Sequence, residues 1–434
     1  MPTVTHLEAL EIIDCRGVPT LEVSCVLDGG VRGNATAPAA GSPGPAEVAE
    51  LRDGEERHRG LGCRKAVALV EGEIRSALVG KRFSDQAALD KVLRNLDGTA
   101  NRSKLGGNTS FAVSLAFARA HAAGRSMPLF RHFAELVGAT PVRLPAPIFT
   151  LFSHTPGEAA DRGPLSLSFV LTQATTVDEA LAMATSVRRQ ADTTVRRVFD
   201  GRVAVAPDGG FEAPFYDTKT MLGQAEQIVQ ACGATGVEWV LKGAGARRYD
   251  LGWYRLDREK LTAKEVIDRL GDWGARHPLA AVIDPLGAED WGAWKNLCER
   301  VSASVLVAGD DLLASHLVRV EKAAADKAVR AVVIKPSQAG SLTDAARTVR
   351  YARKAGLALV VSGRSGETED DWIADLAVGW NAEYLQAGAV AGSERLSKYN
   401  RLLAIEKKTR WPIWRRGDVW PPRRTTGRAI AVGG

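Results

Sequence analysis

The sequence contains no apolar run of the roughly eighteen residues that a membrane-spanning helix needs. Its first residues, MPTVTHLEALEIID, have neither a basic start nor an apolar core, so they do not predict a secretory signal. Cysteine is scarce: the five cysteines are an odd number, and they lack the paired spacing of a metal site. We therefore expect reduced thiols, no membrane association and a cytoplasmic location.

Most of the chain has nearly balanced positive and negative charge. Of the net charge of +6, the segment from Arg410 onward carries +5, because it holds six arginines and one acid, Asp418. The first 409 residues therefore carry only about +1. With 45% apolar and 25% charged residues over 434 positions, the composition predicts a globular protein of two or three units.

The first third of the chain predicts a small mixed unit. Residues 5–30 alternate apolar and polar side chains, which is typical of a strand meander. Residues 31–45 are rich in glycine, alanine and proline, and we expect a mobile loop there. Helical periodicity dominates residues 46–136, with Asp97 and Gly98 marking a break between helices.

After LPAP at positions 144–147, short apolar strands alternate with amphipathic helices. The strands read LSFVLT, VEWVLK, AAVIDP, SVLVAGDD, AVVIKPS and LALVVSG. This regularity predicts parallel βαβ units, and their number predicts a barrel. A barrel places its active site at the carboxyl ends of its strands. That rule selects five positions as site candidates: Lys242, Ile283, Asp310, Lys335 and Gly363.

The segment after Arg410 has no helical or strand period, and its prolines and glycines predict an extended or disordered tail. Its tryptophans, Trp411, Trp414 and Trp420, interleave with the six arginines. That composition can stack on nucleic-acid bases or bind phosphates. The alternative is a segment that docks a protein partner or packs in a dimer.

Several stretches resemble enolase, the phosphopyruvate hydratase of glycolysis, and they occur in the family's order over residues 5–407. They are DCRGVPT (14–20), ELRDG (50–54), LDGT (96–99), SKLG (103–106), GDDL (309–312), RSGETED (364–370) and SERL (393–396). The resemblance implies an α/β protein with an amino-terminal α+β domain at 1–140 and a carboxy-terminal α/β barrel at 141–409. The basic tail at 410–434 follows, and the assembly implied is a homodimer or higher homo-oligomer.

Enolase chemistry removes a proton beside a carboxylate, which requires a base and two divalent cations to hold the resulting charge. The resemblance assigns the base to Lys335. Of the family's three carboxylate ligands, Asp310 retains one, while Ile283 and Lys242 stand at the other two positions. One carboxylate beside an ammonium group and a hydrocarbon side chain makes a poor site for a hard dication, so we expect magnesium binding to be weak or absent.

The other acid–base positions are altered as well. The family's Gln-Glu-Phe corresponds to LSF here, which places Ser168 at the glutamate position. Asp208 stands where the family has a glutamate, so it keeps the carboxylate on a side chain that is one methylene group shorter. Glu212 is a nearby alternative for this acid. His154 corresponds to the family's Ser-His loop, after a short deletion. With Lys335, Asp208 and His154 are the catalytic candidates.

The resemblance also implies contacts to the substrate. Arg364 and Ser365 match the pair that binds the substrate phosphate, and the guanidinium group suits that contact. Gln386 stands where the family has a lysine near the substrate carboxylate, and Gly363 replaces a histidine. Ser42 matches the serine of the family's mobile loop.

These replacements leave three interpretations open. Asp208 and Asp310 balance Lys242 and Lys335 without a metal, because an ammonium group can act as a fixed positive charge. The pocket can then bind or act on a small phosphorylated or carboxylated acid, as a lyase-like relative in a specialised pathway. The second interpretation is a non-catalytic descendant that serves as a binding or scaffold protein. The third is a working glycolytic enolase, which needs a metal site that this sequence does not favour.

Overall fold

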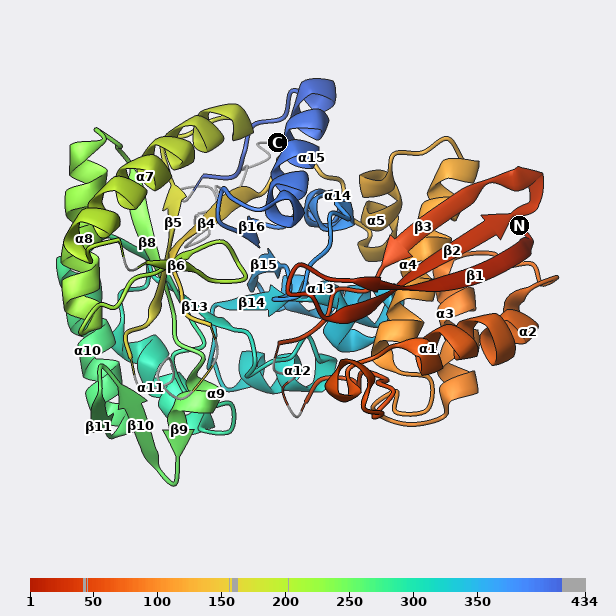
Figure 1. Ribbon diagram of the computed structural model, residues 1–434, viewed down its shortest axis with the longest axis horizontal. Helices are drawn as coiled ribbons and strands as arrows, with labels where there is room; N and C mark the ends of the chain where they lie inside the picture. Colours follow the sequence, from red (N-terminus) through yellow and green to blue (C-terminus); the bar gives the residue numbers. More distant parts are fainter. Residues whose placement is uncertain (42–43, 45, 156, 158–162, 202, 416–434) are drawn as a thin grey trace, which may run out of the picture.

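The computed structural model places an amino-terminal α+β unit beside an eight-stranded barrel (Figure 1). The structure describes residues 1–41, 44, 46–155, 157, 163–201 and 203–415. Among them, no helix has both the length and the apolar character that crossing a bilayer requires. All five cysteines are free thiols.

The amino-terminal sheet is an antiparallel meander of β1 (Val4–Ile13), β2 (Pro19–Leu27) and β3 (Arg32–Thr36). It confirms the strands expected from the alternating pattern. The expectation of a loop from residue 31 is wrong for β3, which pairs along β2 and packs on the helix behind it. Gly33 makes this packing possible, because a Cβ atom there would collide with the backbone of Ala116.

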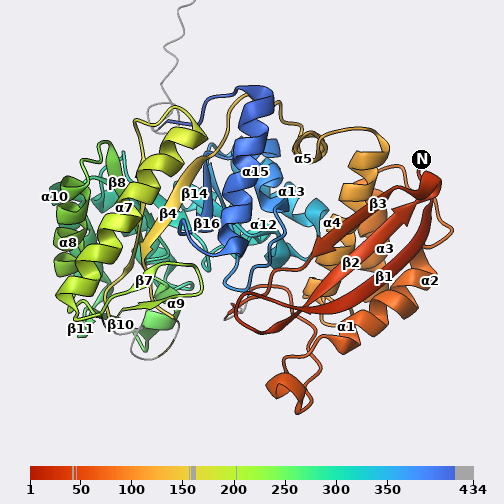
Figure 2. The ribbon, with the colours of Figure 1, turned by 45° about the horizontal axis from the view of Figure 1, so that its top comes forward.

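Five helices complete this unit (Figure 2). They are α1 (Arg64–Leu69), α2 (Arg75–Leu78), α3 (Gln86–Asp97), α4 (Gly107–Gly124) and α5 (Leu129–Val137). Of these, α1, α2 and α4 contact the sheet, and α3 and α5 pack on α4. The break after Asp97 is confirmed, since α3 ends there and Gly98 adopts a left-handed conformation with φ of 70°. The expected helical start near residue 46 is wrong: turns and a short 3₁₀ segment precede the first α-helix at Arg64.

Eight strands form a closed barrel, because the last strand pairs with the first. They are β4 (Ala146–Phe152), β5 (Ser166–Leu171), β8 (Val237–Lys242), β12 (Leu279–Ile283), β13 (Leu306–Gly309), β14 (Ala331–Ile334), β15 (Ala358–Ser362) and β16 (Tyr384–Gly388). Six of them are strands that the sequence predicts, and β4 and β16 are two more.

The expectation of uniformly parallel strands is wrong for β5, which runs antiparallel to both of its neighbours, β4 and β8. β4 and β5 pair side by side and antiparallel, so the chain reverses direction between them. The reversal has a consequence for the site: the amino-terminal residues of β5, Ser166 and Ser168, lie at the barrel edge where the other strands end.

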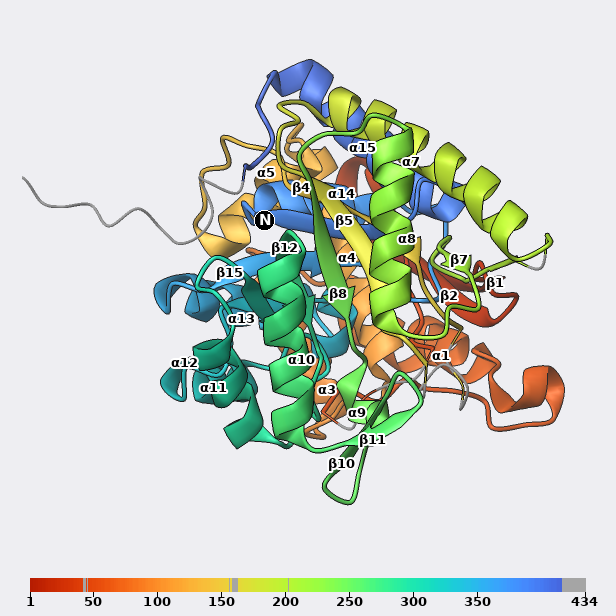
Figure 3. The same cartoon turned by 90° about the vertical axis from the view of Figure 1, so that its left-hand side faces the viewer.

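Helices cover the outside of the barrel, with α7, α8 and α10 visible along one side in Figure 3. The barrel helices are α7 (Val177–Val198), α8 (Thr218–Ala231), α9 (Gly245–Arg248), α10 (Ala263–Arg276), α11 (Trp291–Arg300), α12 (Leu317–Ala325), α13 (Leu342–Lys354), α14 (Trp372–Gly379) and α15 (Ser393–Thr409). Two short strands, β7 (Phe211–Glu212) and β6 (Ala204–Val205), extend the barrel sheet from β4. A separate small sheet consists of β9 (Tyr249–Asp250), β10 (Trp253–Leu256) and β11 (Glu259–Leu261).

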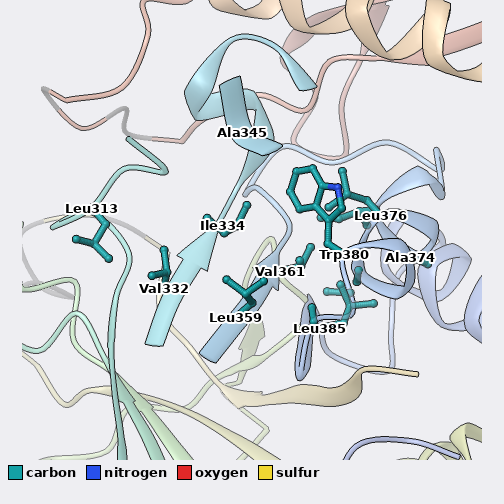
Figure 4. Packing of buried hydrophobic residues seen from close by; sticks show 14 of the residues in the cluster. Leu313, Val332, Ile334, Ala345, Leu359, Val361, Ala374, Leu376, Trp380 and Leu385 are labelled. Carbon is teal, nitrogen blue, oxygen red and sulfur yellow. The ribbon is translucent and has the colours of Figure 1, made fainter. Parts of the chain in front are cut away.

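Alternation along the strands divides the barrel core in two. On β15, Leu359 and Val361 point outward and pack with Leu376 and Trp380 beside α14 (Figure 4). Val360 lies between them in sequence and belongs to a second cluster inside the barrel. The side chains inside are mostly Ala, Val and Ile, so the barrel is filled and leaves room for a ligand only at its rim.

Residues 411–415 follow α15 and lie at the end of the barrel where β4 begins, opposite the cavity. Ile413 bridges to Leu144, and Trp414 packs on the inner cluster below β4 and β16. Trp411 packs edge-on against Phe130 of α5. The rest of the predicted tail, residues 416–434, lies outside the described residues.

Candidate functional site

A cavity of about 400 Å³ opens at the edge of the barrel where the parallel strands end. A volume of this size is typical of small-molecule sites, which occupy roughly 300–1,000 Å³. The amino-terminal unit contributes Gly41, Gly44 and Glu47 to its wall. Its charged lining side chains are Glu47, Asp208, Lys242, Arg247, Arg248, Asp310, Asp311, Lys335, Arg364 and Arg395.

Four of the five strand-end positions selected from the sequence line this cavity: Lys242, Asp310, Lys335 and Gly363. Ile283, the fifth, is fully buried and packs inside the barrel beneath them. It pairs in register with Lys242 on the neighbouring strand. An apolar side chain therefore stands beside the ammonium group at the floor of the cavity.

Asp310 joins the two lysines of the site. Its Oδ2 atom lies 2.9 Å from Nζ of Lys242, and its Oδ1 atom lies 2.5 Å from Nζ of Lys335. Burial opposes the charge on Asp310, but the two ammonium groups outweigh it and hold the pKa of Asp310 well below its usual range. Burial likewise opposes the charge on Lys242, and the attraction of Asp310 raises the pKa of Lys242 above its usual value. Lys242 is therefore a fixed cation at neutral pH.

Asp284 braces the loop that carries Asp310. Its Oδ1 atom accepts a 2.7 Å hydrogen bond from the backbone N–H of Asp310, and its Oδ2 atom accepts one from the N–H of Asp311. Burial, with repulsion from Asp311 and Asp310, raises the pKa of Asp284 well above its usual value. These two hydrogen bonds fix the position of the Asp310 carboxylate relative to the two lysines.

Asp284, Asp310 and Asp311 are the one group of three candidate metal ligands among the described residues. Their existing partners do not fit a divalent cation. Both oxygens of Asp310 face ammonium groups, and both oxygens of Asp284 accept backbone hydrogen bonds. Only Asp311 keeps a carboxylate without such a partner, whereas hard dications require several oxygen ligands. The charge of Lys242 adds a repulsion that a metal ion would have to overcome.

Arg364 lies at the end of β15, where the resemblance implies an anion contact. Its Nη2 atom donates to Oε2 of Glu47 at 2.6 Å, and both side chains are almost completely buried. Its Nη1 atom has no hydrogen-bond partner among the described residues. Ser365 lines the same wall. Ser42, the loop serine that the resemblance selects, lies outside the described residues.

Gln386 lies in the middle of β16 and lines the cavity. Its backbone oxygen accepts from the N–H of Gly363, and its side chain is 9% exposed. The Oε1 atom has no partner among the described residues. The amide offers hydrogen bonds to a ligand without adding charge.

Asp208 and His154 lie together on the opposite wall. Ser153 donates to Oδ1 of Asp208 at 2.6 Å, and the N–H of Gly210 donates to the same oxygen. Burial, with repulsion from Arg248, lowers the pKa of His154, so its imidazole is neutral at pH 7. The structure thus brings Asp208, His154 and Lys335 to one cavity. Glu212, the alternative acid, does not line it and instead accepts from the N–H of Thr155.

The serine at the altered glutamate position, Ser168, lines the cavity with Thr150 and Ser166. Ser168 and Thr150 are directly opposite each other on β5 and β4. Neither these two hydroxyls nor that of Ser166 has a hydrogen-bond partner in the described part of the chain. Three hydroxyls without a hydrogen-bond partner among the described residues therefore line this part of the cavity.

Three further residues were not selected from the sequence: Glu47, Ser166 and Arg248. Glu47 and Arg364 are 317 residues apart, and no local pattern signals their pairing. Ser166 could have been found, because it alternates with leucine in LSLS and so shares a face with Ser168. Arg248 donates to the backbone oxygens of Gly163, Pro164 and Gly243 and holds the rim together.

Two family models match the chain. The model for the enolase C-terminal TIM barrel domain matches residues 142–410. The model for the enolase N-terminal domain matches residues 4–133. The matched ranges correspond to the barrel and to the amino-terminal unit, and together they cover most of the 434 residues.

Proposed function

The chain belongs to the enolase family, and from that premise we propose that it binds a small phosphorylated or carboxylated anion without a divalent metal ion. The observation that carries the proposal is the pairing of Asp310 with both Lys242 and Lys335. An ammonium group fixed at the floor of the cavity supplies positive charge at the place where the family holds a dication.

Arg364 and Ser365 support the anion-binding part of the proposal. Glu47 holds one side of the guanidinium group, which fixes its orientation at the edge of the cavity. Arg364 still carries a nitrogen without a partner among the described residues, and the Ser365 hydroxyl lies on the same wall. Charged hydrogen bonds from arginine to phosphate or carboxylate oxygens are about twice as strong as neutral ones.

We propose further that dehydration of 2-phosphoglycerate is not the reaction of this protein. That reaction builds a second negative charge on the substrate carboxylate, and cations with strong local fields must stabilise it. Lys242 supplies a single charge, and Ile283 supplies none. Proton transfer by Lys335, Asp208 and His154 would then be limited to ligands whose charge two ammonium groups can stabilise.

A second candidate is a binding or scaffold protein without catalysis. Ser168, Ile283, Gly363 and Gln386 favour it, because each replaces a group that the family's chemistry uses. Both candidates share the anion site and differ in whether a bound ligand is converted to product.

Calorimetric titration of the full chain with inorganic phosphate and with 2-phosphoglycerate, in buffer containing EDTA, tests the proposal. We expect saturable binding of the anion in EDTA and no more than about a two-fold change when magnesium replaces EDTA. Arg364→Gln should weaken binding by at least about 10-fold, because it removes a charged hydrogen bond. Arg350→Gln, at an exposed position of α13, is the control for the loss of one charge.

Binding that occurs only with magnesium would overturn the proposal. So would the absence of binding by both anions, or equal losses in the two arginine variants.

A further inference from the structure

The cavity has two chemically different sides, which follow the strand order of the barrel. On one side, Lys242 ends β8, and Asp310, Lys335 and Arg364 follow β13, β14 and β15. We call these four residues the charged side. The remaining strands at the rim, β16, β4 and β5, are neighbours through the pairing that closes the barrel. They contribute Gln386, Thr150, Ser166 and Ser168, which we call the hydroxyl side.

The hydroxyl side is a built surface of polar groups. Thr150 is 5% exposed and Ser168 is 3% exposed, and they face each other on adjacent strands. Ser166 follows two residues away on the same face of β5 and pairs with Lys242 of β8. Within the described part of the chain, none of the three hydroxyls makes a hydrogen bond. The three hydroxyls lie on the cavity wall and can donate and accept hydrogen bonds there, so this surface favours a ligand that carries polar groups.

Of the charged groups beside the hydroxyl side, Asp208 opposes a second negative charge, while Lys242 is paired with Asp310. Arg248 and Arg395 donate to backbone oxygens.

Asp208 lies beside the hydroxyl side, held by Ser153, and its carboxylate accepts hydrogen bonds from hydroxyls but repels a carboxylate. His154 is neutral, since burial and Arg248 lower its pKa. Arg248 directs its three nitrogens to backbone oxygens of the rim. Arg247 is exposed at the mouth of the cavity.

We propose that the ligand is a phosphorylated polyhydroxy compound, with its phosphate on the charged side and its hydroxyl-bearing body against Thr150, Ser166, Ser168 and Gln386. This inference rests on the proposed anion site and narrows its ligand class. A phosphorylated carboxylic acid would place its carboxylate against uncharged groups and near Asp208. A polyol phosphate instead gives and accepts hydrogen bonds there, and it concentrates its charge at Arg364 and the lysines.

Two probes separate these ligand classes on the same carbon skeleton. Glycerol 2-phosphate differs from 2-phosphoglycerate only in carrying a hydroxymethyl group where the latter carries a carboxylate. By calorimetry with the full chain in EDTA, we expect glycerol 2-phosphate to bind about 10-fold more tightly than 2-phosphoglycerate. Its hydroxymethyl group can make one or two more hydrogen bonds, and it avoids the repulsion between a carboxylate and Asp208.

Substitutions of the hydroxyl side test whether its residues bind the body of glycerol 2-phosphate. Ser168→Ala and Thr150→Val should each weaken glycerol 2-phosphate binding by about 3- to 10-fold, and should leave inorganic phosphate binding within about two-fold. Ser362→Ala is the matched control, because Ser362 lines the same cavity on β15 and its hydroxyl already donates to the backbone oxygen of Gly363. We expect it to change neither affinity.

The outcomes distinguish a failure of the polyhydroxy ligand class from a failure of the proposed anion site. If inorganic phosphate and both organic probes fail to bind, the anion site itself is overturned. If inorganic phosphate binds but 2-phosphoglycerate binds more tightly than glycerol 2-phosphate, only the polyhydroxy ligand is overturned. Equal losses in Ser168→Ala and Ser362→Ala would also contradict it.

Discussion

At the residue scale, the site centres on a carboxylate with two cationic partners. Asp310 is 1% exposed, and each of its oxygens faces a different ammonium group. Removing a charge from water is costly, and here the cost is offset because the carboxylate is paired on both sides. The same arrangement explains why the site holds positive charge and yet does not fit a divalent cation.

Replacement of Lys242 by methionine tests this arrangement. Asp310 would keep Lys335 but lose the partner of its Oδ2 atom, so we expect the free energy of unfolding to fall by about 1–3 kcal/mol. Urea denaturation of the variant and of wild type measures the loss. Lys264→Met, which removes an exposed lysine on α10, is the control and should be nearly neutral. Equal stability of Lys242→Met and wild type would contradict the structural role of the ion pair.

A second residue-scale prediction concerns pH and lies far from the cavity. His132 of α5 is 2% exposed, neither ring nitrogen has a hydrogen-bond partner among the described residues, and its ring lies edge-on to His121. Burial, with the nearby His121, lowers the pKa of His132 from 6.5 to about 4. Below pH 6.5 the unfolded chain therefore binds a proton that the folded chain does not, and stability falls as the pH falls.

Between pH 7 and pH 4, His132 should cost about 3 kcal/mol of stability. His132→Phe removes the titrating group and should flatten this part of the pH profile of the unfolding free energy. His316→Gln, at an exposed position before α12, should leave the slope unchanged. A slope in His132→Phe equal to that of wild type would show that other groups cause the pH dependence.

Single residues also show what the sequence could predict of the site. Lys242, Asp310 and Lys335 were predictable because each ends a recognisable apolar strand, and such ends meet at one edge of a barrel. The pairing of Glu47 with Arg364 was not predictable, because it joins distant segments of two units. The partners of Asp310 were not predictable either, since a residue position at a strand end does not determine which side-chain atoms meet.

At the element scale, the direction of β5 decides the chemistry of one wall. Its sequence, SLSFVL, predicts a strand with serines on one face, but it carries no information on whether the strand runs parallel or antiparallel. The direction depends on the connection from β4, part of which lies outside the described residues. Only the antiparallel direction places both Ser166 and Ser168 at the rim with Lys242.

The segment after α15 is another element whose packing the sequence did not predict. Composition indicated an extended or disordered tail, but within residues 411–415 Ile413 pairs with Leu144 and Trp414 packs on the inner cluster at the end of the barrel opposite the cavity. Burial of an aromatic side chain depends on the surface that it contacts, and the local sequence around Trp414 does not specify that surface.

Trp414→Ala should therefore destabilise the barrel by about 1–3 kcal/mol, because the indole covers apolar side chains that water would otherwise reach. Thermal and urea unfolding measure the loss. Trp253→Ala, on the exposed strand β10, is the matched control and should cost less. If Trp414→Ala is as stable as the control variant, the segment does not stabilise the barrel.

At the scale of the whole molecule, the amino-terminal unit contacts the barrel through packed helices and through ion pairs. Arg119 of α4 pairs with Asp370, which follows β15 and is 7% exposed, and Glu47 pairs with Arg364. Backbone hydrogen bonds also link Ala39 with Gly366. The cavity is therefore built from both units, and its geometry depends on how they dock.

Arg119→Ala tests this docking. It leaves the buried carboxylate of Asp370 without its arginine, so we expect a loss of about 2–4 kcal/mol and weaker binding of phosphate, although Arg119 does not line the cavity. Differential scanning calorimetry and phosphate titration measure the two effects. Arg125→Ala, which removes an exposed pair with Glu135 within the amino-terminal unit, is the control. Unchanged stability and affinity in Arg119→Ala would contradict the dependence of the cavity on docking.

The measurement that most directly tests the central claim, that this enolase-family site works without a divalent metal ion, is calorimetric titration of magnesium into the full chain. It is made with and without 2-phosphoglycerate, beside a spectrophotometric assay for phosphoenolpyruvate. The account predicts no saturable magnesium binding in either condition and no phosphoenolpyruvate, because Lys242 and Lys335 already pair with Asp310 and the oxygens of Asp284 already accept backbone hydrogen bonds. Saturable magnesium binding accompanied by phosphoenolpyruvate formation would contradict it.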